Sequence, residues 1–403
     1  MLPAEEQLRI IKSGAANIVP EADLLKKLKR GEPLNIKLGV DPTSPDLHLG
    51  HAVPLRKMRQ FQDLGHRVTL IIGNGTALIG DPSGKNTTRP QLTQEEVEAN
   101  AKTYVEQAFN VLDPEKTTVV YNADWILSLD LKGLLEIASK FTVARILERD
   151  DFTKRYQSHT PIALHEFLYP VMQAYDSVVI KADVEMGGND QLFNLLAGRE
   201  LMEKMGMEPQ IALTMPLLEG TDGVQKMSKS YGNYVGLTDE PADMFGKIMS
   251  IPDELMPRYF RLASTLSVDE VDEIERGLAN DELHPNKVKR MLARNIVTLY
   301  HDEAAAEAAE EQFDRVFKQH EVPEDTPEFA ADLTPNDEGK VYLAKLLHDA
   351  GMAPSTGEAR RLIDGGGVKI NGEAVAARQY NVDPGLLAGA TLQVGKRKFV
   401  KLV

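Results

Sequence analysis

The sequence contains no cysteine, which excludes disulfide bonds, a thiolate nucleophile and a thiolate zinc site. No uninterrupted apolar stretch is long enough to span a membrane, and the first ten residues, MLPAEEQLRI, lack the basic and apolar segments of a signal peptide. Acidic residues outnumber basic ones: 46 Lys and Arg against 61 Asp and Glu give a net charge of −15. This charge excludes a protein that binds nucleic acid with its whole surface. We therefore expect a cytoplasmic protein with no membrane partner.

The N-terminal half of the chain alternates between strand and helix patterns. LNIKLGV (34–40) has the pattern of a buried strand, the turn-forming DPTSPD follows it, and a helical pattern then leads to a second strand pattern, RVTLIIG (67–73). Similar strand patterns recur near residues 120, 180 and 213. Strand–helix–strand units of this kind pair in parallel with a right-handed crossover. The alternation predicts an α/β, doubly wound, parallel-sheet (Rossmann-like) domain, at residues 1–236.

The remainder of the chain divides by composition. Residues 237–325 are rich in helix formers and predict an α-helical domain, and the acidic, proline-containing residues 326–340 predict a linker. Residues 341–403 carry nine Lys or Arg against five Asp or Glu, a net charge of +4 on an otherwise acidic chain. Within them Ser355 and Glu358 form a capping-box pattern before a run of glycines, and short strand patterns follow. We expect a small α+β module there.

The motif HLGH stands where the first strand pattern passes into its helix. A helix N-terminus offers free backbone N–H groups and a positive dipole to phosphates, and His48 and His51 add two imidazole donors. Gly50 between them lets a flat ring approach the backbone. Two other interpretations remain open: histidines that only cap or pack the helix, and a metal pair, for which no third ligand occurs at helical spacing.

Two glycine-rich turns are similar to known nucleotide-binding motifs but do not match them. In GDPSGK (80–85) the first glycine of a P-loop falls on Ile79, and Asn86 replaces its Ser or Thr. In GNGTALIG, Leu78 holds the third glycine position of the dinucleotide fingerprint. The sequence therefore indicates neither a Walker-type ATPase nor a standard dehydrogenase.

Two further motifs each have a functional and an ordinary interpretation. KMSKS (226–230) brings two ammonium groups into a Gly- and Ser-rich stretch that can close over a polyphosphate, or it is an exposed basic turn. In YPVMQAYDS (169–177) the side chains of Tyr169, Gln173 and Asp176 share one helical face. That face is either solvated or the wall of a pocket for a small polar molecule.

With HLGH and KMSKS present in this order, the chain resembles the class I aminoacyl-tRNA synthetases, and YPVMQAYD followed by GGNDQ (187–191) is similar to the tyrosyl-tRNA synthetases. The resemblance covers essentially the whole chain. It implies a catalytic domain, a helical anticodon-side domain and a C-terminal module like the RNA-binding module of a small-subunit ribosomal protein (S-four-like). The tryptophanyl relatives share the first two motifs but normally lack that tail.

The resemblance implies a tyrosine site on the helix of the YPVMQAYD motif, in which Asp176 accepts a hydrogen bond from the substrate phenol. Phenylalanine would leave this buried acceptor unpaired, which costs free energy. Lys37 is a departure, because the better-known bacterial branch has a tyrosine there, two positions before Gly39, that also contacts the hydroxyl. Our hypothesis is that Lys37 either turns away or pairs with Asp176. The other residues implied for the tyrosine site are Tyr169, Gln173 and Asp81 around the α-ammonium, with Gln191 and Thr76.

The implied reaction has two steps. ATP activates tyrosine as tyrosyl-adenylate with release of pyrophosphate, and the adenylate then acylates the terminal ribose of tRNA(Tyr). We expect His48 and His51 at the phosphates, with Lys226 and Lys229 closing over the pyrophosphate. Further candidates around ATP are Thr43, Lys85, Gly39, Asp41 and Gly50. Magnesium is expected to arrive with ATP, without a dedicated metal site or a permanent cofactor.

An acidic protein that binds tRNA must concentrate its basic residues locally. The candidate tRNA contacts are Lys287, Arg290 and Arg294 on one helical face, and Arg360, Arg361, Lys396, Arg397 and Lys398 in the C-terminal module. Solvated charged faces are the alternative interpretation. The family resemblance also implies a homodimer, although no residue pattern demonstrates one.

Three competing functions share part of these motifs. A tryptophanyl-tRNA synthetase would perform the same chemistry, but Asp176 and the C-terminal module argue against it. A synthetase-like RNA-binding or regulatory protein would have lost activity, whereas both signature motifs are intact here. A tRNA-independent nucleotidyl transferase of this fold would not need the C-terminal module.

Overall fold

The computed structural model describes residues 1–42, 46–81, 93–318, 326–336, 339–395 and 398–403. Four of the predicted site residues lie outside the described residues, namely Thr43, Lys85, Lys396 and Arg397. The chain forms two compact units, Met1–Ala306 and Glu307–Val403. The domain boundaries expected at residues 236, 325 and 340 stay predictions.

The first unit is built on a sheet with the strand order β1-β6-β5-β2-β3-β4. Its strands are β1 Asn17–Val19, β2 Asn35–Val40, β3 Arg67–Ile72, β4 Thr117–Tyr121, β5 Val184–Gly188 and β6 Ile211–Met215. Neighbouring strands run parallel, except that β1 pairs antiparallel with β6 at the edge. The chain order reverses between β2 and β5, which confirms the doubly wound sheet and puts the expected ligand crevice at the carboxyl ends of these two strands.

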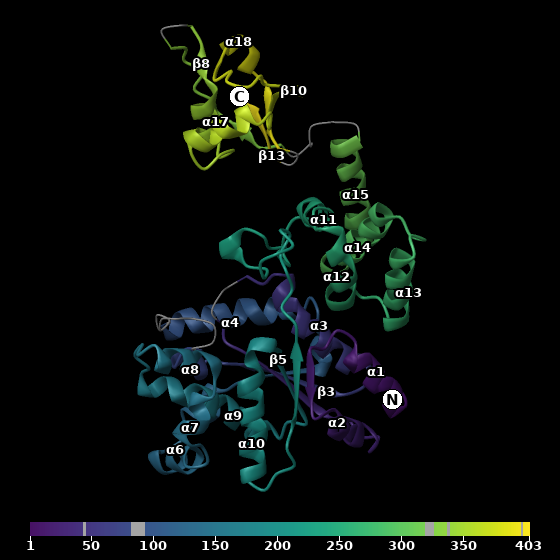
Figure 1. The fold of residues 1–403 in the computed structure, drawn as a ribbon, viewed down its shortest axis with the longest axis vertical. Coiled ribbons are helices and arrows are strands. Elements are labelled where there is room, and N and C mark those ends of the chain that lie inside the picture. The colour runs from purple at the N-terminus through teal and green to yellow at the C-terminus, as the bar shows by residue number, and fades with distance from the viewer. Residues whose placement is uncertain (43–45, 82–92, 319–325, 337–338, 396–397) are drawn as a thin grey trace. The chain divides into compact units, whose positions relative to one another are not determined.

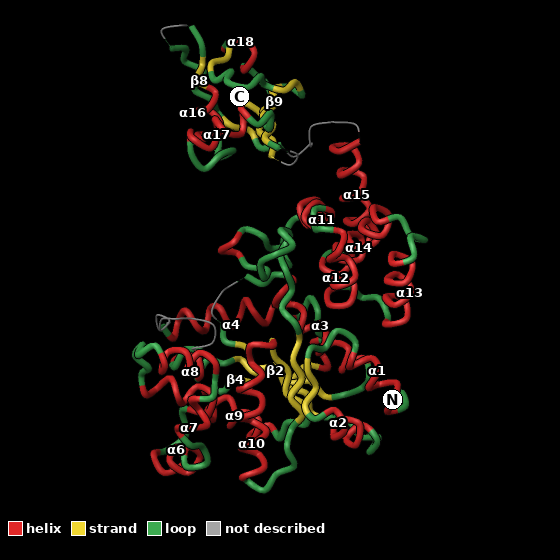
Figure 2. The backbone as a smooth tube through the Cα atoms, viewed as in Figure 1, coloured by secondary structure: helices red, strands yellow, loops and turns green. Residues whose placement is uncertain are grey.

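Helices flank this sheet on both sides, with α9 and α10 on one side and α1 and α2 on the other (Figure 1). The helices of the first unit are α1 Ala4–Lys12, α2 Glu21–Leu28, α3 Leu49–Asp63, α4 Gln94–Ala108, α5 Ala123–Ile126, α6 Leu131–Ala138, α7 Val143–Leu147, α8 Asp150–Gln157, α9 Leu168–Ile180, α10 Leu192–Lys204, α11 Pro241–Met249, α12 Met256–Ala263, α13 Val268–Ala279 and α14 Pro285–Tyr300. The next helix, α15 Glu303–Lys318, passes from the first unit into the second. Figure 2 shows helices joined by loops from α11 to α15, in agreement with the predicted helical segment.

Two helices carry the motifs, and their apolar residues explain their packing. α3 packs against β2, β3 and β5 and buries an apolar stripe that begins at Leu49. α9 buries Val171 and Met172 in a core that it shares with α10. The strand predicted near residue 180 begins only at Val184, because α9 extends through Ile180.

The second unit has its own apolar core. Its elements are β7 Glu328–Phe329, β8 Val341–Tyr342, α16 Leu343–Asp349, α17 Thr356–Asp364, β9 Val368–Ile370, β10 Glu373–Ala374, β11 Asn381–Val382, α18 Pro384–Leu387, β12 Thr391–Val394 and β13 Lys398–Leu402. One sheet has the order β10-β9-β12-β13-β7, β8 pairs with β11, and Leu347, Ile363 and Leu392 are fully buried between helices and sheet. Ser355 Oγ accepts a hydrogen bond from the Glu358 N–H (3.2 Å), so the serine caps α17 as its sequence pattern predicts.

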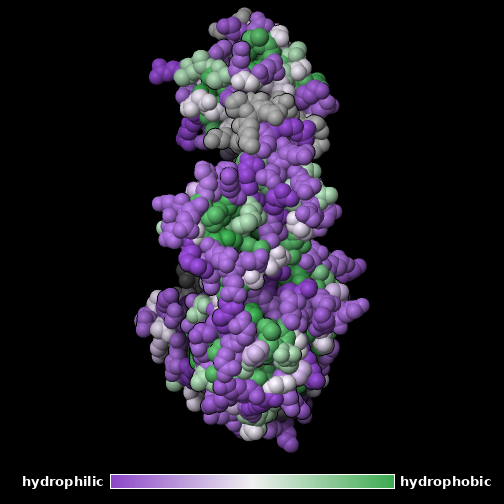
Figure 3. Space-filling view, turned by 90° about the vertical axis from the view of Figure 1, so that its right-hand side faces the viewer, coloured by the Kyte–Doolittle hydropathy of each residue, from purple (hydrophilic) through white to green (hydrophobic). Residues whose placement is uncertain are grey.

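The surface of the molecule is largely polar on the face shown in Figure 3, where hydrophilic side chains surround small hydrophobic patches. Among the described helices, α14 and α15 each have 16 residues. No helix within the described residues combines the length and the apolar character that a membrane crossing needs.

Candidate functional site

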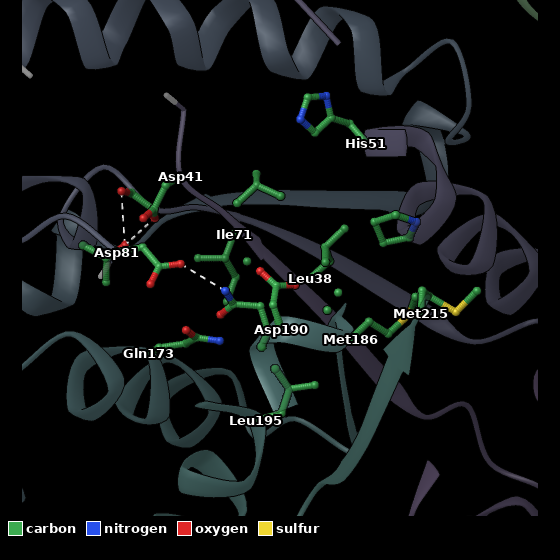
Figure 4. A pocket seen from close by; sticks show the side chains of 18 of the residues that line it. Leu38, Asp41, His51, Ile71, Asp81, Gln173, Met186, Asp190, Leu195 and Met215 are labelled. Atoms are coloured by element: carbon green, nitrogen blue, oxygen red, sulfur yellow. Dashed lines mark hydrogen bonds between the residues drawn. The ribbon is translucent and has the colours of Figure 1, made fainter. Parts of the chain in front are cut away.

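A cavity of about 330 Å³ opens where β2 and β5 end, at the switch point of the sheet. Its wall comes from segments far apart in the chain: the end of β2, the start of α3, the turn after β3, α9, β5 and the loop after β6. The predicted site residues that line it are Gly39, Asp41, Gly50, His51, Thr76, Asp81, Tyr169, Gln173, Asp176 and Gln191. In Figure 4 the carboxyl groups of Asp41 and Asp81 lie at one end of the cavity and His51 lies at the other.

The polar face of α9 is a wall of this cavity. Tyr169 and Asp176 are buried, and Gln173 is half-buried between them. Asp176 accepts hydrogen bonds from Trp125 Nε1 (2.8 Å) and Asn122 Nδ2 (3.2 Å). Burial raises the pKa of Asp176 to about 6, although the positive charge of Lys37 and then these two donors oppose the shift. The carboxyl group at this end of α9 is therefore an acceptor held in a fixed position.

Asp41, which follows β2, lies between two of the residues predicted for the tyrosine site. Thr76 Oγ1 donates to its Oδ1 and Tyr169 OH donates to its Oδ2, both at 2.8 Å. Burial, together with the neighbouring Asp81 carboxylate, raises the pKa of Asp41 to about 7. A cation at this end of the cavity would favour the ionised form of both carboxyl groups. Asp41, which we predicted at ATP, thus lies among the residues of the predicted tyrosine site.

The Asp81 carboxylate is held from two sides. Arg149 Nη2 donates to its Oδ1 and Gln191 Nε2 donates to its Oδ2, each at 3.0 Å. Arg149 is itself buried and pairs with Asp151 at 2.8 Å. These contacts fix the carboxylate at the cavity wall.

Lys37 lies beneath the cavity and is not among the described residues that line it. It is fully buried on β2 directly opposite Glu185 on β5, and the two side chains form an ion pair at 2.9 Å. Lys37 Nζ also donates to the backbone oxygen of Gln173 (3.3 Å). Of the two alternatives stated for Lys37, the structure does not show the pair with Asp176, because the register of the two strands gives Lys37 Glu185 as its partner. Its predicted contact with tyrosine stays a prediction.

The HLGH motif begins α3, with His48 at the N-cap position. The rings of His48 and His51 stack with their centroids 3.8 Å apart, and the His48 backbone N–H donates to His51 Nδ1 (3.4 Å). Because His51 Nδ1 accepts, the neutral ring carries its hydrogen on Nε2, from which it can donate to a ligand. Burial lowers the pKa of His48 to about 3, and partial burial with Lys229 nearby lowers that of His51, whose ring is exposed to the cavity. A Cβ at Gly50 would lie 3.0 Å from His48 Cε1, so glycine preserves the ring stack.

The KMSKS segment lies beside the start of α3, because His48 and Gly236, which follows the motif, form a β-bridge. Lys226 is exposed at the start of the motif. Lys229 Nζ pairs with Asp46 at 2.5 Å, and both side chains are partly exposed. The Lys229 ammonium is therefore close to His48 and His51 at the start of α3 without being buried there.

Asn233 fastens the KMSKS segment to its neighbours. Its Oδ1 accepts from the Ser228 N–H (2.8 Å), and its Nδ2 donates to Asp222 Oδ2 (2.9 Å) and to the Lys226 carbonyl (3.2 Å). Asn233 is buried, and a Cβ at Gly220 would lie 2.2 Å from its side chain. Only glycine at position 220 therefore allows this arrangement.

The predicted tRNA contacts fall in both units. On α14, Lys287 is exposed and Arg290 and Arg294 are half-buried. In the second unit, Arg361 and Lys398 are exposed. Their positions are accessible to a large ligand, and their role stays a prediction.

Arg360 of the second unit is fixed against two tyrosines. Its Nε donates to Tyr342 OH (2.6 Å), and its guanidinium carbon lies 5.5 Å and 5.2 Å from the ring centroids of Tyr342 and Tyr380. Tyr380 OH in turn donates to Asp364 (2.8 Å). The guanidinium is thus presented at the surface in a fixed orientation.

The sequence did not predict the side chains that form hydrogen bonds or ion pairs with the predicted site residues. These are Asn122, Trp125, Arg149, Glu185 and Asn194. Trp125 is the only tryptophan of the chain and Glu185 interrupts an apolar strand, so both gave a signal that could have been used. The other three gave none, because Asn and Arg are ordinary residues in loops and helices.

Comparisons with known proteins show the family of this chain. Residues 29–318 match the family described as tRNA synthetases class I (W and Y), and residues 343–387 match the S4 domain. Among solved structures, the tyrosyl-tRNA synthetase of Archaeoglobus fulgidus, complexed with L-tyrosine, has a TM-score of 0.62 at 23% identity, with 75% of this chain and 99% of that chain covered. At this identity the likeness concerns the fold alone.

Two bacterial relatives are similar over nearly their whole length. The chain is 53% identical over 400 residues to the tyrosine–tRNA ligase of Moorella thermoacetica, covering 98% of this chain and 95% of the relative. It is also 53% identical over 399 residues to that of Aquifex aeolicus, covering 99% of both chains. By this similarity, and by the two family matches, the chain belongs to the bacterial tyrosine–tRNA ligases, class I synthetases with a C-terminal S4 domain.

Proposed function

We propose that the chain is a tyrosine–tRNA ligase, which forms tyrosyl-adenylate from L-tyrosine and ATP and then charges tRNA(Tyr). The observation that carries the proposal is a single cavity in which the acceptors Asp81, Gln173 and Asp176 meet the start of α3 with His51. A ligand with a phenol and an ammonium group suits the three acceptors, and phosphates suit the helix start.

The α9 end of the cavity is the proposed site of the amino acid. The phenol donates to Asp176, whose position two hydrogen bonds from the protein fix. Phenylalanine would exclude water from Asp176 without offering it a hydrogen, so the remaining lone pairs of this buried acceptor would be left without a donor. The α-ammonium is proposed to bind among Asp81, Tyr169 and Gln173, where its charge offsets the cost of burying a carboxylate.

Adenylate formation requires positioning and relief of charge, and it requires no general base. The carboxylate of tyrosine is already ionised and attacks the α-phosphorus, while the bond from this phosphorus to the oxygen bridging to the β-phosphate breaks and pyrophosphate leaves. The backbone N–H groups at the start of α3 and Nε2–H of His51 are the proposed donors to the phosphate oxygens. Gly39 and Asp41, at and after the end of β2, line the same cavity, with Asp41 on the side of the proposed amino-acid site.

Lys226 and Lys229 are proposed to neutralise the leaving pyrophosphate. Lys229 would exchange Asp46 for the phosphates, and an ion pair as exposed as this one resists the exchange by only about 1 kcal/mol or less. Magnesium is proposed to enter bound to the phosphates of ATP. Within the described residues no group of three or more His, Asp or Glu is suited to hold a metal ion without them.

In the second step a hydroxyl of the terminal ribose of tRNA(Tyr) attacks the carbonyl carbon of the adenylate, and AMP leaves. Lys287 on α14 and the exposed Arg361 and Lys398 of the second unit are proposed phosphate contacts. Arg360 adds an exposed planar donor that Tyr342 holds in place, and a guanidinium is a residue of choice for phosphate. Removing residues 341–403 should weaken tRNA charging far more than tyrosine activation, and an equal loss of both would argue against a separate RNA-binding role.

A homodimer in the cytoplasm is part of the proposal. Several large apolar side chains in one segment of the first unit are at least 60% exposed, namely Leu127, Leu131, Leu135, Val143 and Leu164. Apolar side chains that gather in one exposed segment suit a partner surface, for which a second copy is the proposed occupant. Light scattering during gel filtration should give twice the mass of one chain, and the mass of one chain at the enzyme's working concentration would reject the dimer.

Amino-acid-dependent ATP–pyrophosphate exchange without tRNA tests the activity, with tyrosine, tryptophan and phenylalanine assayed in parallel. Exchange with tyrosine alone is the expected result. Exchange with tryptophan would overturn the substrate, and no exchange with any of the three would favour an RNA-binding protein. Asp176→Ala should abolish the tyrosine signal, whereas Asp124→Ala, an exposed carboxylate on α5, is the matched control.

A further inference from the structure

A buried carboxylate, Glu185 on β5, collects hydrogen-bond donors beneath the cavity. Its Oε1 accepts from Lys37 Nζ (2.9 Å) and Gln173 Nε2 (3.1 Å). Its Oε2 accepts from Ser177 Oγ (3.2 Å) and from Gln210 Nε2. Glu185 is 1% exposed, so these four donors take the place of water around the carboxylate.

This carboxylate decides which way the amide of Gln173 points. The oxygen and nitrogen of an amide have nearly the same shape, so only the hydrogen-bond network sets their orientation. Because an ionised Glu185 can only accept, Gln173 must present its Nε2 to it. The Gln173 oxygen is then left to accept, and it receives Nδ2 of Asn194 at 3.0 Å. That oxygen keeps a second lone pair, and Gln173 lines the cavity.

The same polarity continues to Asp81. Asn194 Oδ1 accepts from Arg149 Nη1 (3.3 Å), so its Nδ2 is the end that faces the glutamines. That Nδ2 donates to Gln191 Oε1 (2.8 Å), which leaves Gln191 Nε2 to donate to Asp81 Oδ2 (3.0 Å). We call Glu185, Gln173, Asn194, Gln191 and Asp81 the amide relay. Three charged groups that cannot reverse, the acceptors Glu185 and Asp81 and the donor Arg149, fix the direction of every bond in it.

We propose that Glu185, held by Lys37, is a positioning residue for the amino-acid substrate: its carboxylate turns the Gln173 amide so that the amide oxygen, together with the Asp81 carboxylate, is presented to the substrate ammonium. An ammonium group has three donors and no acceptor. A reversed Gln173 would turn its own NH2 group toward that ammonium, donor against donor. This inference rests on the proposed function, since it assigns a role within the proposed tyrosine site.

The test compares two ligands that differ only in the ammonium group. Calorimetric titration would measure the binding of L-tyrosine and of 3-(4-hydroxyphenyl)propanoate, which lacks the ammonium. Glu185→Gln removes the fixed acceptor, so L-tyrosine should bind about tenfold more weakly or worse, while the analogue should bind within about twofold of its affinity for the unsubstituted protein. An equal loss for both ligands would mean that Glu185 only supports the structure, and it would overturn the inference.

Asn194→Asp separates hydrogen-bond direction from charge. Aspartate has the same shape as asparagine but cannot donate to Gln173 or Gln191, so the relay loses its direction and L-tyrosine should again bind about tenfold more weakly. If the cavity attracted the ammonium by net charge alone, the added negative charge would strengthen binding. Unchanged or tighter binding of L-tyrosine to this variant would therefore overturn the inference, including in the case that Glu185→Gln does not fold.

Controls separate this inference from the proposed function. Glu203→Gln removes an exposed carboxylate from α10, and both ligands should bind to it as to the unsubstituted protein. Circular dichroism would establish that each variant is folded before titration. If the unsubstituted protein itself fails to bind L-tyrosine, the proposed function fails and the inference fails with it. If that protein binds L-tyrosine and both relay variants do so equally well, only the inference fails.

Discussion

Replacing Asp41 by asparagine should stabilise the protein while it damages the site, and the gain should depend on pH. In the folded protein the pKa of Asp41 is raised to about 7 from its ordinary value of 3.8, chiefly by burial and by the Asp81 carboxylate. The unfolded chain therefore releases this proton at a lower pH than the folded protein does. Between these two pKa values the folded state binds more protons, so its stability falls by about 1.4 kcal/mol for each unit that the pH rises.

The magnitude follows from this slope. From pH 5 to pH 8 only the two units below pH 7 count, which gives a loss of about 2.7 kcal/mol in the unsubstituted protein. The amide introduced by Asp41→Asn would not titrate, so the advantage of this variant in free energy of unfolding should grow by about that amount over the same interval. The hydrogen bond lost when the amide oxygen accepts from only one of Thr76 and Tyr169 costs about 1 kcal/mol at both pH values and leaves the difference unchanged.

Urea denaturation followed by circular dichroism at pH 5 and pH 8 measures this difference. Asp124→Asn, an exposed carboxylate on α5, is the control and should change stability little at either pH. If the advantage of Asp41→Asn were the same at both pH values, Asp41 would be ionised across the whole interval, and the reasoning from burial would be refuted. Tyrosine-dependent pyrophosphate exchange by the same variant should fall, which would show that the site holds this carboxylate at the expense of stability.

Three further predictions follow from the same contacts. Trp125→Phe removes the 2.8 Å hydrogen bond to Asp176 and should raise the KM for tyrosine about tenfold in pyrophosphate exchange. The KM for ATP is the internal control, and an unchanged KM for tyrosine would contradict the role of this contact. The affinity for tyrosine should fall as the pH is lowered from 8 to 5, because Asp41 and Asp176, with pKa values of about 7 and 6, lose their charge over that range; calorimetric titration giving a flat profile would contradict this. Asn233→Ala should lower kcat for adenylate formation about tenfold without changing the KM for tyrosine, because it removes hydrogen bonds that hold the KMSKS segment and none that hold α9. A change confined to the KM for tyrosine would contradict this role of Asn233.

The sheet and the position of the cavity were predictable because their signals are local. The strand patterns of β2 and β3 and the HLGH motif between them define one βαβ unit, whose helix must begin at the carboxyl edge of the sheet. The helical spacing of Tyr169, Gln173 and Asp176 gave the correct face of α9. In each case neighbouring residues in the chain decide the geometry.

The supporting contacts were not predictable because they depend on pairings between distant segments. Lys37 faces Glu185 only because β2 and β5 pair in one particular register, and a shift of one strand by one residue would turn its side chain to the opposite face from its partner. Trp125 reaches Asp176 from the segment after β4, which no spacing in the sequence connects to α9. Arg149 meets Asp81 in the same way, across two segments that only the folded chain brings together.

The contact between Trp125 and Asp176 also has an optical consequence. Because the chain has one tryptophan, all of its indole fluorescence comes from a ring whose N–H donates to the carboxyl group that we propose to bind the phenol. The arrival of a phenol or a proton at Asp176 changes the electric field at this ring, so the emission should shift as the site fills. The protein therefore contains its own reporter of amino-acid binding, and rapid mixing could follow each step of activation without a label.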